Sequence, residues 1–152
     1  MKNFTYLLTA LWMIFLSACS PRIAPIYVDD SWREVHENIS KIEKDFKSKN
    51  LKVHTHYQKD TILLLSYQQS LPVEMLYLFK QDSCYYQEIN LFCEPCSDKL
   101  MNTILKDKNY KFKAVDKENY ISQKFPDIIM RLNTVAGKDD LVCNSISIRK
   151  IK

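Results

Sequence analysis

The amino-acid sequence predicts an α+β domain in which an antiparallel sheet carries helices on one of its faces. Apolar residues recur at helical spacing in one long and one short segment. Most of the remaining chain between residues 51 and 151 alternates between apolar and polar positions, as half-buried strands do. The links between these expected strands are short enough for hairpins, which favours antiparallel pairing.

The 152 residues divide into three expected parts. Residues 1–18 are an N-terminal signal, residues 19–30 an extended tether and residues 31–152 a single domain. The tether contains Pro21 and Pro25 and has no helical period. Hydrophobic residues make up 46% of the chain, which is enough for a core.

The N-terminal signal begins with the basic Lys2, followed by an apolar run from Phe4 to Leu16. A run of about 13 residues is too short to span a bilayer, which needs roughly 20, but it is typical of the apolar region of a secretion signal. The run ends in Leu16-Ser17-Ala18-Cys19, which resembles the lipobox of bacterial lipoproteins. The resemblance implies cleavage before Cys19 by a type II signal peptidase, a diacylglyceryl group on its sulfur and a further acyl chain on its amino group.

Such a lipid anchor implies a cell-envelope protein whose first partner is the lipid bilayer. In lipoproteins of enteric bacteria, an Asp after the lipidated Cys retains the protein in the inner membrane. Here Ser20 follows Cys19, which favours the outer membrane.

The first helix is expected to begin at a capping box of Ser31 and Glu34 and to end near Lys49. One face of it carries apolar residues at spacings of three and four: Trp32, Val35, Ile39, Ile42 and Phe46. Expected strands follow at residues 51–58, 61–67, 73–79 and 84–91.

The same order then repeats. A short helix capped by Ser97 carries an apolar face, made of Leu100, Met101, Ile104 and Leu105. Expected strands follow at residues 110–114, 119–123, 128–133 and 141–151. We therefore interpret residues 31–92 and 97–151 as two tandem α-β-β-β-β units. In the alignment of the two, Ile89 falls on Ile146 and Pro72 on Pro126. Both helices are expected on one face of the sheet, and the other face is expected to be polar or partly aromatic.

Four cysteines follow the signal, and an even number in an exported protein predicts disulfides. Cys84 and Cys93 are too far apart along one strand to bond. Two arrangements stay open, Cys93–Cys96 with Cys84–Cys143, or Cys84–Cys96 with Cys93–Cys143. The aligned halves place Cys84 and Cys143 on the same sheet face, which favours the first arrangement.

Cys93-Glu94-Pro95-Cys96, between an apolar run and a helix, resembles the active site of thioredoxin. The likeness extends over residues 84–150, with an acidic turn at 115–119 and a proline-led strand at Pro126. It implies thiol–disulfide exchange by Cys93 and Cys96, with Cys96 in the positive potential of a helix start. However, no Trp precedes Cys93, and one helix is missing before Pro126 and another after Ile151.

Other functional classes have weaker support. The single glycine, Gly137, argues against phosphate-cradling loops, and the absence of a basic block argues against nucleic-acid binding. His54 and His56 share one strand face with Lys52 and Gln58, which indicates a solvated face and no metal site, and His36 is expected on the polar side of its helix. Five tyrosines are spread over adjacent expected strands, and most of them are expected at the edge of the core: Tyr57, Tyr67, Tyr77, Tyr85 and Tyr86. A sheet face lined by them would instead suit recognition of a protein or a glycan.

The sequence thus predicts a membrane-anchored envelope lipoprotein of a non-enzymatic binding or structural type, with no cofactor. The partner would be an envelope protein or a glycan. The alternative is a thiol–disulfide oxidoreductase that uses Cys93 and Cys96.

Overall fold

The computed structural model describes residues 26–66, 73–136 and 142–151. That part of the chain folds into one eight-stranded antiparallel sheet and two helices, so the predicted α+β class holds, with sheet predominating. The elements are α2 (Trp32–Ser48), β1 (Val53–Gln58), β2 (Thr61–Ser66), β3 (Val73–Lys80), β4 (Ser83–Leu91), α3 (Glu94–Leu105), β5 (Phe112–Ala114), β6 (Asn119–Ser122), β7 (Ile128–Ala136) and β8 (Val142–Lys150).

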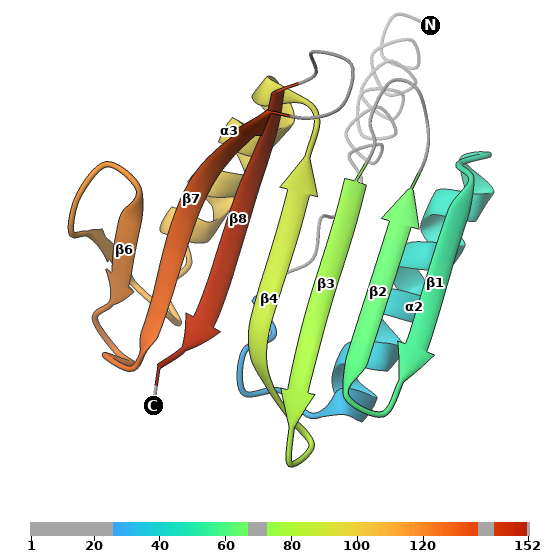
Figure 1. The fold of residues 1–152 in the computed structure, drawn as a ribbon, viewed down its shortest axis with the longest axis horizontal. Helices are drawn as coiled ribbons and strands as arrows, with labels where there is room; N and C mark the ends of the chain where they lie inside the picture. Colours follow the sequence, from blue (N-terminus) through green and yellow to red (C-terminus); the bar gives the residue numbers. More distant parts are fainter. Residues whose placement is uncertain (1–25, 67–72, 137–141, 152) are drawn as a thin grey trace, which may run out of the picture.

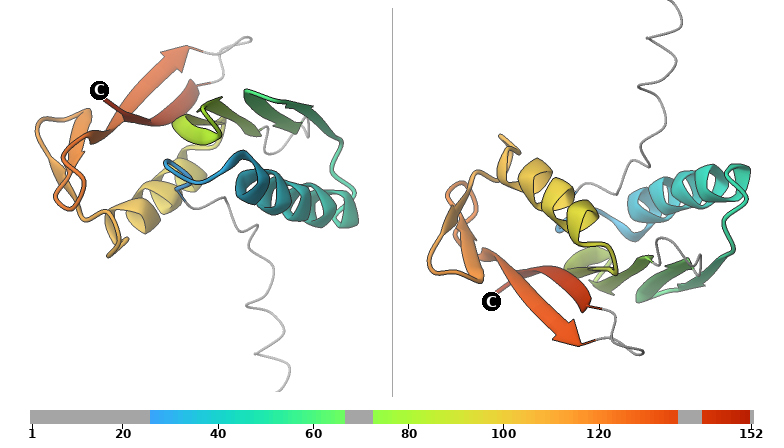
Figure 2. Two further views of the ribbon diagram at one scale, coloured as in Figure 1. Left: turned by 90° about the horizontal axis from the view of Figure 1, so that it is seen from below. Right: turned by 90° about the horizontal axis from the view of Figure 1, so that it is seen from above.

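The strands lie in the order β1-β2-β3-β4-β8-β7-β6-β5 (Figure 1). Four strands follow α2 and four follow α3, and the pairing of β4 with β8 joins the two groups in the middle of the sheet. Both helices cover the same face, and the other face is bare within the described chain (Figure 2). We call the two faces the helix-covered face and the open face.

The capping box predicted for α2 is present. The Ser31 hydroxyl accepts a hydrogen bond from the Glu34 amide, and the Glu34 carboxylate accepts one from the Ser31 amide. Val35, Ile39 and Phe46 are buried against the sheet, while Trp32 and Ile42 are partly buried beside them. The apolar stripe therefore does what its spacing predicts.

The start of α3 differs from the prediction. The N-cap is Cys93, and Ser97 lies inside the helix, where its hydroxyl donates to the Glu94 carbonyl at 2.7 Å. Pro95 sits in the first turn, where its missing N–H leaves no bond unmade. Serine is a common N-cap residue, which made Ser97 a plausible cap, but Pro95 belongs to the first turn and places the cap at Cys93.

The end of the predicted tether is also part of the domain. Ile26, Tyr27 and Val28 are buried, so residues 26–30 form what we call the N-terminal strap. Figure 2 shows it between the two helices, on the helix-covered face. Its apolar side chains reach the core because α2 and α3 leave the middle of the sheet uncovered. Residues 19–25, the remainder of the predicted tether, lie outside the described chain.

The β3–β4 hairpin turns on Gln81 and Asp82, both with positive φ (51° and 63°). Two-residue hairpin turns of this kind favour Asn and Gly, and other residues adopt them at a cost. The Trp32 amide donates to the Asp82 carbonyl at 3.3 Å, and Ser31 bridges to Ser83. The N-terminus of α2 thereby stabilises the turn.

Candidate functional site

Of the four cysteines expected to form disulfides, two are bonded to each other and two are free. Cys93 and Cys96 are joined by a disulfide, with their Cα atoms 5.2 Å apart. The bond ties the N-cap of α3 to the first turn, and both residues are only half-buried. Beneath it, the buried Ser97 hydroxyl accepts a hydrogen bond at 2.8 Å from Asn144 of β8. The disulfide therefore fixes the start of α3 above the central strand pair.

Cys84 and Cys143 are both free and buried, so the predicted bond between them is wrong. Cys84 lies on the helix-covered face, against the strap, whereas Cys143 alternates with the inward Asn144 and Ile146 and so lies on the open face. They also lie far apart along the strands, because β4 and β8 run antiparallel and Cys143 lies beyond the Leu91–Asn144 pair. The bulge between Leu78 and Phe79, which sequence alignment does not reveal, changes the face of Cys84.

Pro126, which the resemblance to thioredoxin would place beside the active-site cysteines, lies far from the disulfide. Pro126 precedes β7, whose first residue pairs with Lys150, while the disulfide lies near the Leu91–Asn144 pair. Six residues along β8 separate these levels, or about 20 Å. No peptide bond in the described chain is cis, and the sheet is antiparallel throughout.

The open face carries a cluster of half-buried leucines on β2 and β3, which we call the leucine patch: Leu63, Leu65, Leu76 and Leu78. Leu63 lies directly opposite Leu76, and the other two are their diagonal neighbours. The sequence analysis missed this patch. Its signal was present, since Ile62–Leu65 is a continuous apolar run, and such runs are typical of strands that are apolar on both faces.

Beside the leucine patch, the middle of the open face is polar, and we call this part the charged strip. Its members come from β3, β4, β7 and β8: Glu74, Tyr86, Glu88, Asn90, Arg131, Ser145, Ser147 and Arg149. Tyr86 donates a hydrogen bond to Glu88, and Asn90 donates one to Glu74 at 3.4 Å. Burial, together with the Glu88 hydrogen bond and charge, raises the pKa of Tyr86.

The four tyrosines of this set that lie within the described chain do not line one face. Tyr77 is fully buried on the helix-covered side and Tyr57 packs there too, whereas Tyr86 lies on the open face and Tyr85 is exposed at the bulge. Tyr67 lies outside the described residues. The open face is therefore aliphatic and charged, with one central tyrosine.

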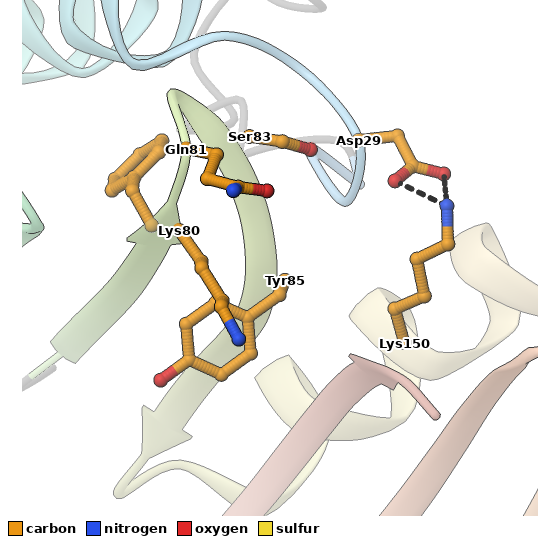
Figure 3. A pocket seen from close by; sticks show the side chains of 7 residues that line it. Asp29, Lys80, Gln81, Ser83, Tyr85 and Lys150 are labelled. Atoms are coloured by element: carbon orange, nitrogen blue, oxygen red, sulfur yellow. Dashed lines mark hydrogen bonds and ion pairs between the residues drawn. The ribbon is translucent and has the colours of Figure 1, made fainter. Parts of the chain in front are cut away.

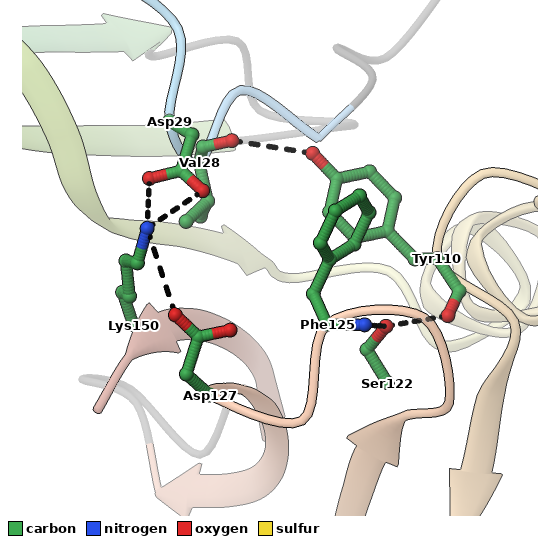
Figure 4. A network of polar contacts seen from close by, with 7 residues as sticks. All are labelled: Val28, Asp29, Tyr110, Ser122, Phe125, Asp127 and Lys150. Atoms are coloured by element: carbon green, nitrogen blue, oxygen red, sulfur yellow. Dashed lines mark hydrogen bonds and ion pairs between the residues drawn. The ribbon is translucent and has the colours of Figure 1, made fainter. Parts of the chain in front are cut away.

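A pocket of about 720 Å³ lies between the β3–β4 hairpin and the C-terminal end of β8 (Figure 3). Its rim includes Lys80, Ser83 and Tyr85 on one side and an ion pair of Asp29 with Lys150 on the other. Lys150 contacts Asp29 at 2.8 Å and Asp127 at 3.5 Å (Figure 4). The hydrogen bond to Asp29 and the two carboxylates raise the pKa of Lys150. The positive charge of Lys150 is thus balanced by two carboxylates, and the ion pairs link β8 to residues 26–30 and to the residue before β7.

The histidines lie apart from this polar network. His54 and His56 are exposed on β1, as predicted. His36 is not on the solvated side of its helix, because it stacks on Trp32 at 4.7 Å and meets Tyr57 edge-on at 4.3 Å. Across residues 26–66, 73–136 and 142–151, no three His, Cys, Asp or Glu side chains are grouped so that they would hold a metal ion.

Comparison of the chain with protein-family models, curated proteins and solved structures finds no match. Within the described ranges, no helix is long and apolar enough to cross a membrane. Cys19, the predicted lipidation site, lies outside these ranges.

Proposed function

We propose that the protein is a lipid-anchored, non-catalytic binding protein of the bacterial cell envelope, and that the open face of its sheet is the binding surface. The anchor follows from Leu16-Ser17-Ala18-Cys19. Ser20 after the lipidated residue favours the outer membrane.

The observation that carries the proposal is that both helices cover one face of the sheet and leave the leucine patch beside the charged strip (Figure 2). An apolar patch next to polar and charged groups is how protein–protein interfaces are composed. Eight strands of about six residues give a face of roughly 34 by 20 Å, which approaches the ~800 Å² per partner of a standard interface. A protein of the envelope fits this surface better than a glycan, because Tyr86 is the one tyrosine that the described strands place on it to stack on a sugar.

Two experiments test the two parts of the proposal. Fatty-acid labelling should mark the wild-type protein and not Cys19→Ser, and label on the variant would refute the anchor. A photo-crosslinking amino acid at Leu76 should give specific adducts in cells, whereas one at Lys44 on α2 should not. Adducts from Lys44 alone would refute the open face as the binding surface.

We also propose that the sheet is built from two tandem α-β-β-β-β units. The order of elements supports this, since α2 and α3 are each followed by four strands. Ile89 and Ile146, which the sequence alignment equates, pair directly at the centre of the sheet. A twofold relation between the units would require this placement, since equivalent residues meet on the axis.

A second candidate function, thiol–disulfide exchange, has one observation in its favour. Cys93 and Cys96 form a half-exposed disulfide across the start of a helix, where a thiolate would be stabilised. Reductase activity with dithiothreitol and a disulfide substrate tests it. Activity that is lost in Cys93→Ser and kept in Cys143→Ser would establish this function and displace the non-catalytic one.

A further inference from the structure

The N-terminal strap enters the domain in the middle of the helix-covered face and not at an edge. The Tyr27 amide donates a hydrogen bond at 2.8 Å to Gln87 of β4, and the Tyr27 ring meets the ring of Tyr77 of β3 with centroids 5.8 Å apart. Gln87 and Tyr77 are buried on the helix-covered face, on the central strand β4 and on its neighbour β3. Residues 26–30 therefore contact the sheet in the gap between α2 and α3 (Figure 2).

The strap is held in this gap by both groups of strands. The Asp29 amide donates to the Cys84 carbonyl at 2.8 Å, on the α2 side of the sheet. Tyr110, which follows α3, donates its hydroxyl to the Val28 carbonyl at 3.2 Å, and Lys150 of β8 pairs with Asp29 (Figure 4). Contacts on both sides fix the strap as part of the rigid domain.

We propose that the strap orients the domain on the membrane, with the helix-covered face toward the lipid and the open face directed away from it. This inference rests on the lipid anchor at Cys19 proposed above. Seven residue steps separate Cys19 from Ile26, and a fully extended chain spans them with at most about 25 Å. The helix-covered face is therefore kept close to the bilayer.

The opposite orientation would require the same seven steps to pass around the sheet. The shortest way around runs along the strands, about 10 Å from the middle of the sheet to the strand ends, and the thickness of the domain adds at least about 10 Å more. That route would consume most of the reach of the chain. Leaving directly through the gap between the helices consumes little of it.

The exposed side of α2 carries charges of both signs, Lys41 and Lys44 with Glu37 and Asp45. It has no basic block of the kind that binds anionic lipid. The anchor and the strap, and not a charged patch, therefore determine the orientation. The leucine patch and charged strip are then presented to proteins on the aqueous side.

Depth-dependent quenching tests the orientation. The full lipidated chain is reconstituted into vesicles of phosphatidylethanolamine and phosphatidylglycerol that carry a nitroxide on a fraction of the headgroups. A fluorescent amino acid replaces Lys44 on α2 or Asn102 on α3, and in separate proteins Leu76 or Ser147 on the open face. Labels on the two faces differ in height by roughly 20 Å, since the helix layer and the sheet each contribute about 10 Å. Quenching should be several-fold stronger for Lys44 and Asn102.

Two controls separate the orientation from the anchor. Six Gly and Ser residues inserted after Ser20 lengthen the reach without touching the fold, and they should reduce the difference between the faces. Mass spectrometry of Cys19 reports the anchor independently. Lipidated protein with equal quenching on both faces would overturn the orientation alone, whereas a Cys19 without lipid would overturn the anchor and the orientation together.

Discussion

The two groups of strands, β1–β4 and β5–β8, have inner strands of similar length and outer strands of different length. The inner strands are eight and nine residues long after α2, and nine each after α3. The outer strands have six residues each after α2, but only three and four after α3. The central four strands form a common core, whereas the edges vary. A three-residue edge strand offers few unpaired backbone groups to other chains, so a short β5 also limits aggregation.

The two groups also differ on the open face and at the start of their helices. The α2 side has the leucine patch, and its helix begins with a complete capping box. The α3 side has Arg131 and Arg149 on the open face, and its helix begins at a Cys93 that makes no side-chain cap bond but carries a disulfide. The N-terminus of α3 is thus held by a covalent bond, and the N-terminus of α2 by hydrogen bonds. Substitutions in each group measure how far the stability of one group depends on the other.

Truncation of a buried helix residue should have the largest effect. Ile39 of α2 and Ile104 of α3 are both buried against the sheet. Ile39→Ala and Ile104→Ala should each lower the free energy of unfolding by about 2–5 kcal/mol, through lost burial and the cavity left behind. Because β4 and β8 pair along the centre, urea unfolding should remain a single transition in both variants. Two separate transitions in either variant would show that the two groups fold independently.

Alkaline pH should destabilise the protein through Cys84, on the α2 side. Burial is the main cause that raises the pKa of this thiol from 9.0 to about 12. Between pH 9 and 12 the folded protein keeps the proton and the unfolded chain releases it, so the free energy of unfolding falls as pH rises. The slope reaches at most about 1.4 kcal/mol per pH unit for one group.

Urea unfolding at a series of pH values from 8 to 11 measures this slope. Cys84→Ala should make it shallower while leaving the part due to Tyr27, whose pKa burial also raises to about 12. Burial also raises the pKa of Cys143, on the α3 side. Cys143→Ala is therefore the matched comparison for the change in slope. An unchanged slope in Cys84→Ala would mean that this thiol is accessible in the folded state.

The sequence was sufficient to predict most elements because their signals are local. A capping box and a stripe of period 3.6 define α2, and alternation defines β1, β3 and β4 within one or two residues. The strap was not predictable in this way. Ile26, Tyr27 and Val28 carry no sequence pattern that predicts burial. They are buried because the two helices leave a gap that they fill.

The cysteines show the same limit at the candidate site. Cys93 and Cys96 are close in sequence, so their pairing is a local matter. The face of Cys84 depends on a bulge, and the position of Cys143 depends on which strands become neighbours, and neither has a local signal. The leucine patch had such a signal in its continuous apolar run, but a run of this kind does not say which face the helices will cover.

Loss of the disulfide should have a moderate effect. A closed loop of four residues stabilises the folded state by about 2 kcal/mol in the chain-entropy model. The double variant Cys93→Ala with Cys96→Ala should lose about this much, and the wild-type protein in reductant should match it. Near-equality with the oxidised protein would show that the first turn of α3 is already held by the Ser97–Asn144 hydrogen bond.

The smallest effect is expected on the open face, where neighbouring residues of β3 give an internal comparison. Met75 is fully buried under the helices, and Leu76, the next residue, is half-buried in the leucine patch. Met75→Ser should be severely destabilising, since it removes buried apolar surface and leaves a hydroxyl in the core. Leu76→Ser should cost only about 1 kcal/mol, because part of the side chain is already in contact with water. With the photo-crosslinking amino acid moved to Ser147 on the same face, Leu76→Ser should abolish the adducts, so binding would be lost while the fold is kept. A loss of stability at Leu76 as large as at Met75 would mean that something covers the open face in the free protein, and the leucine patch would then belong to the core.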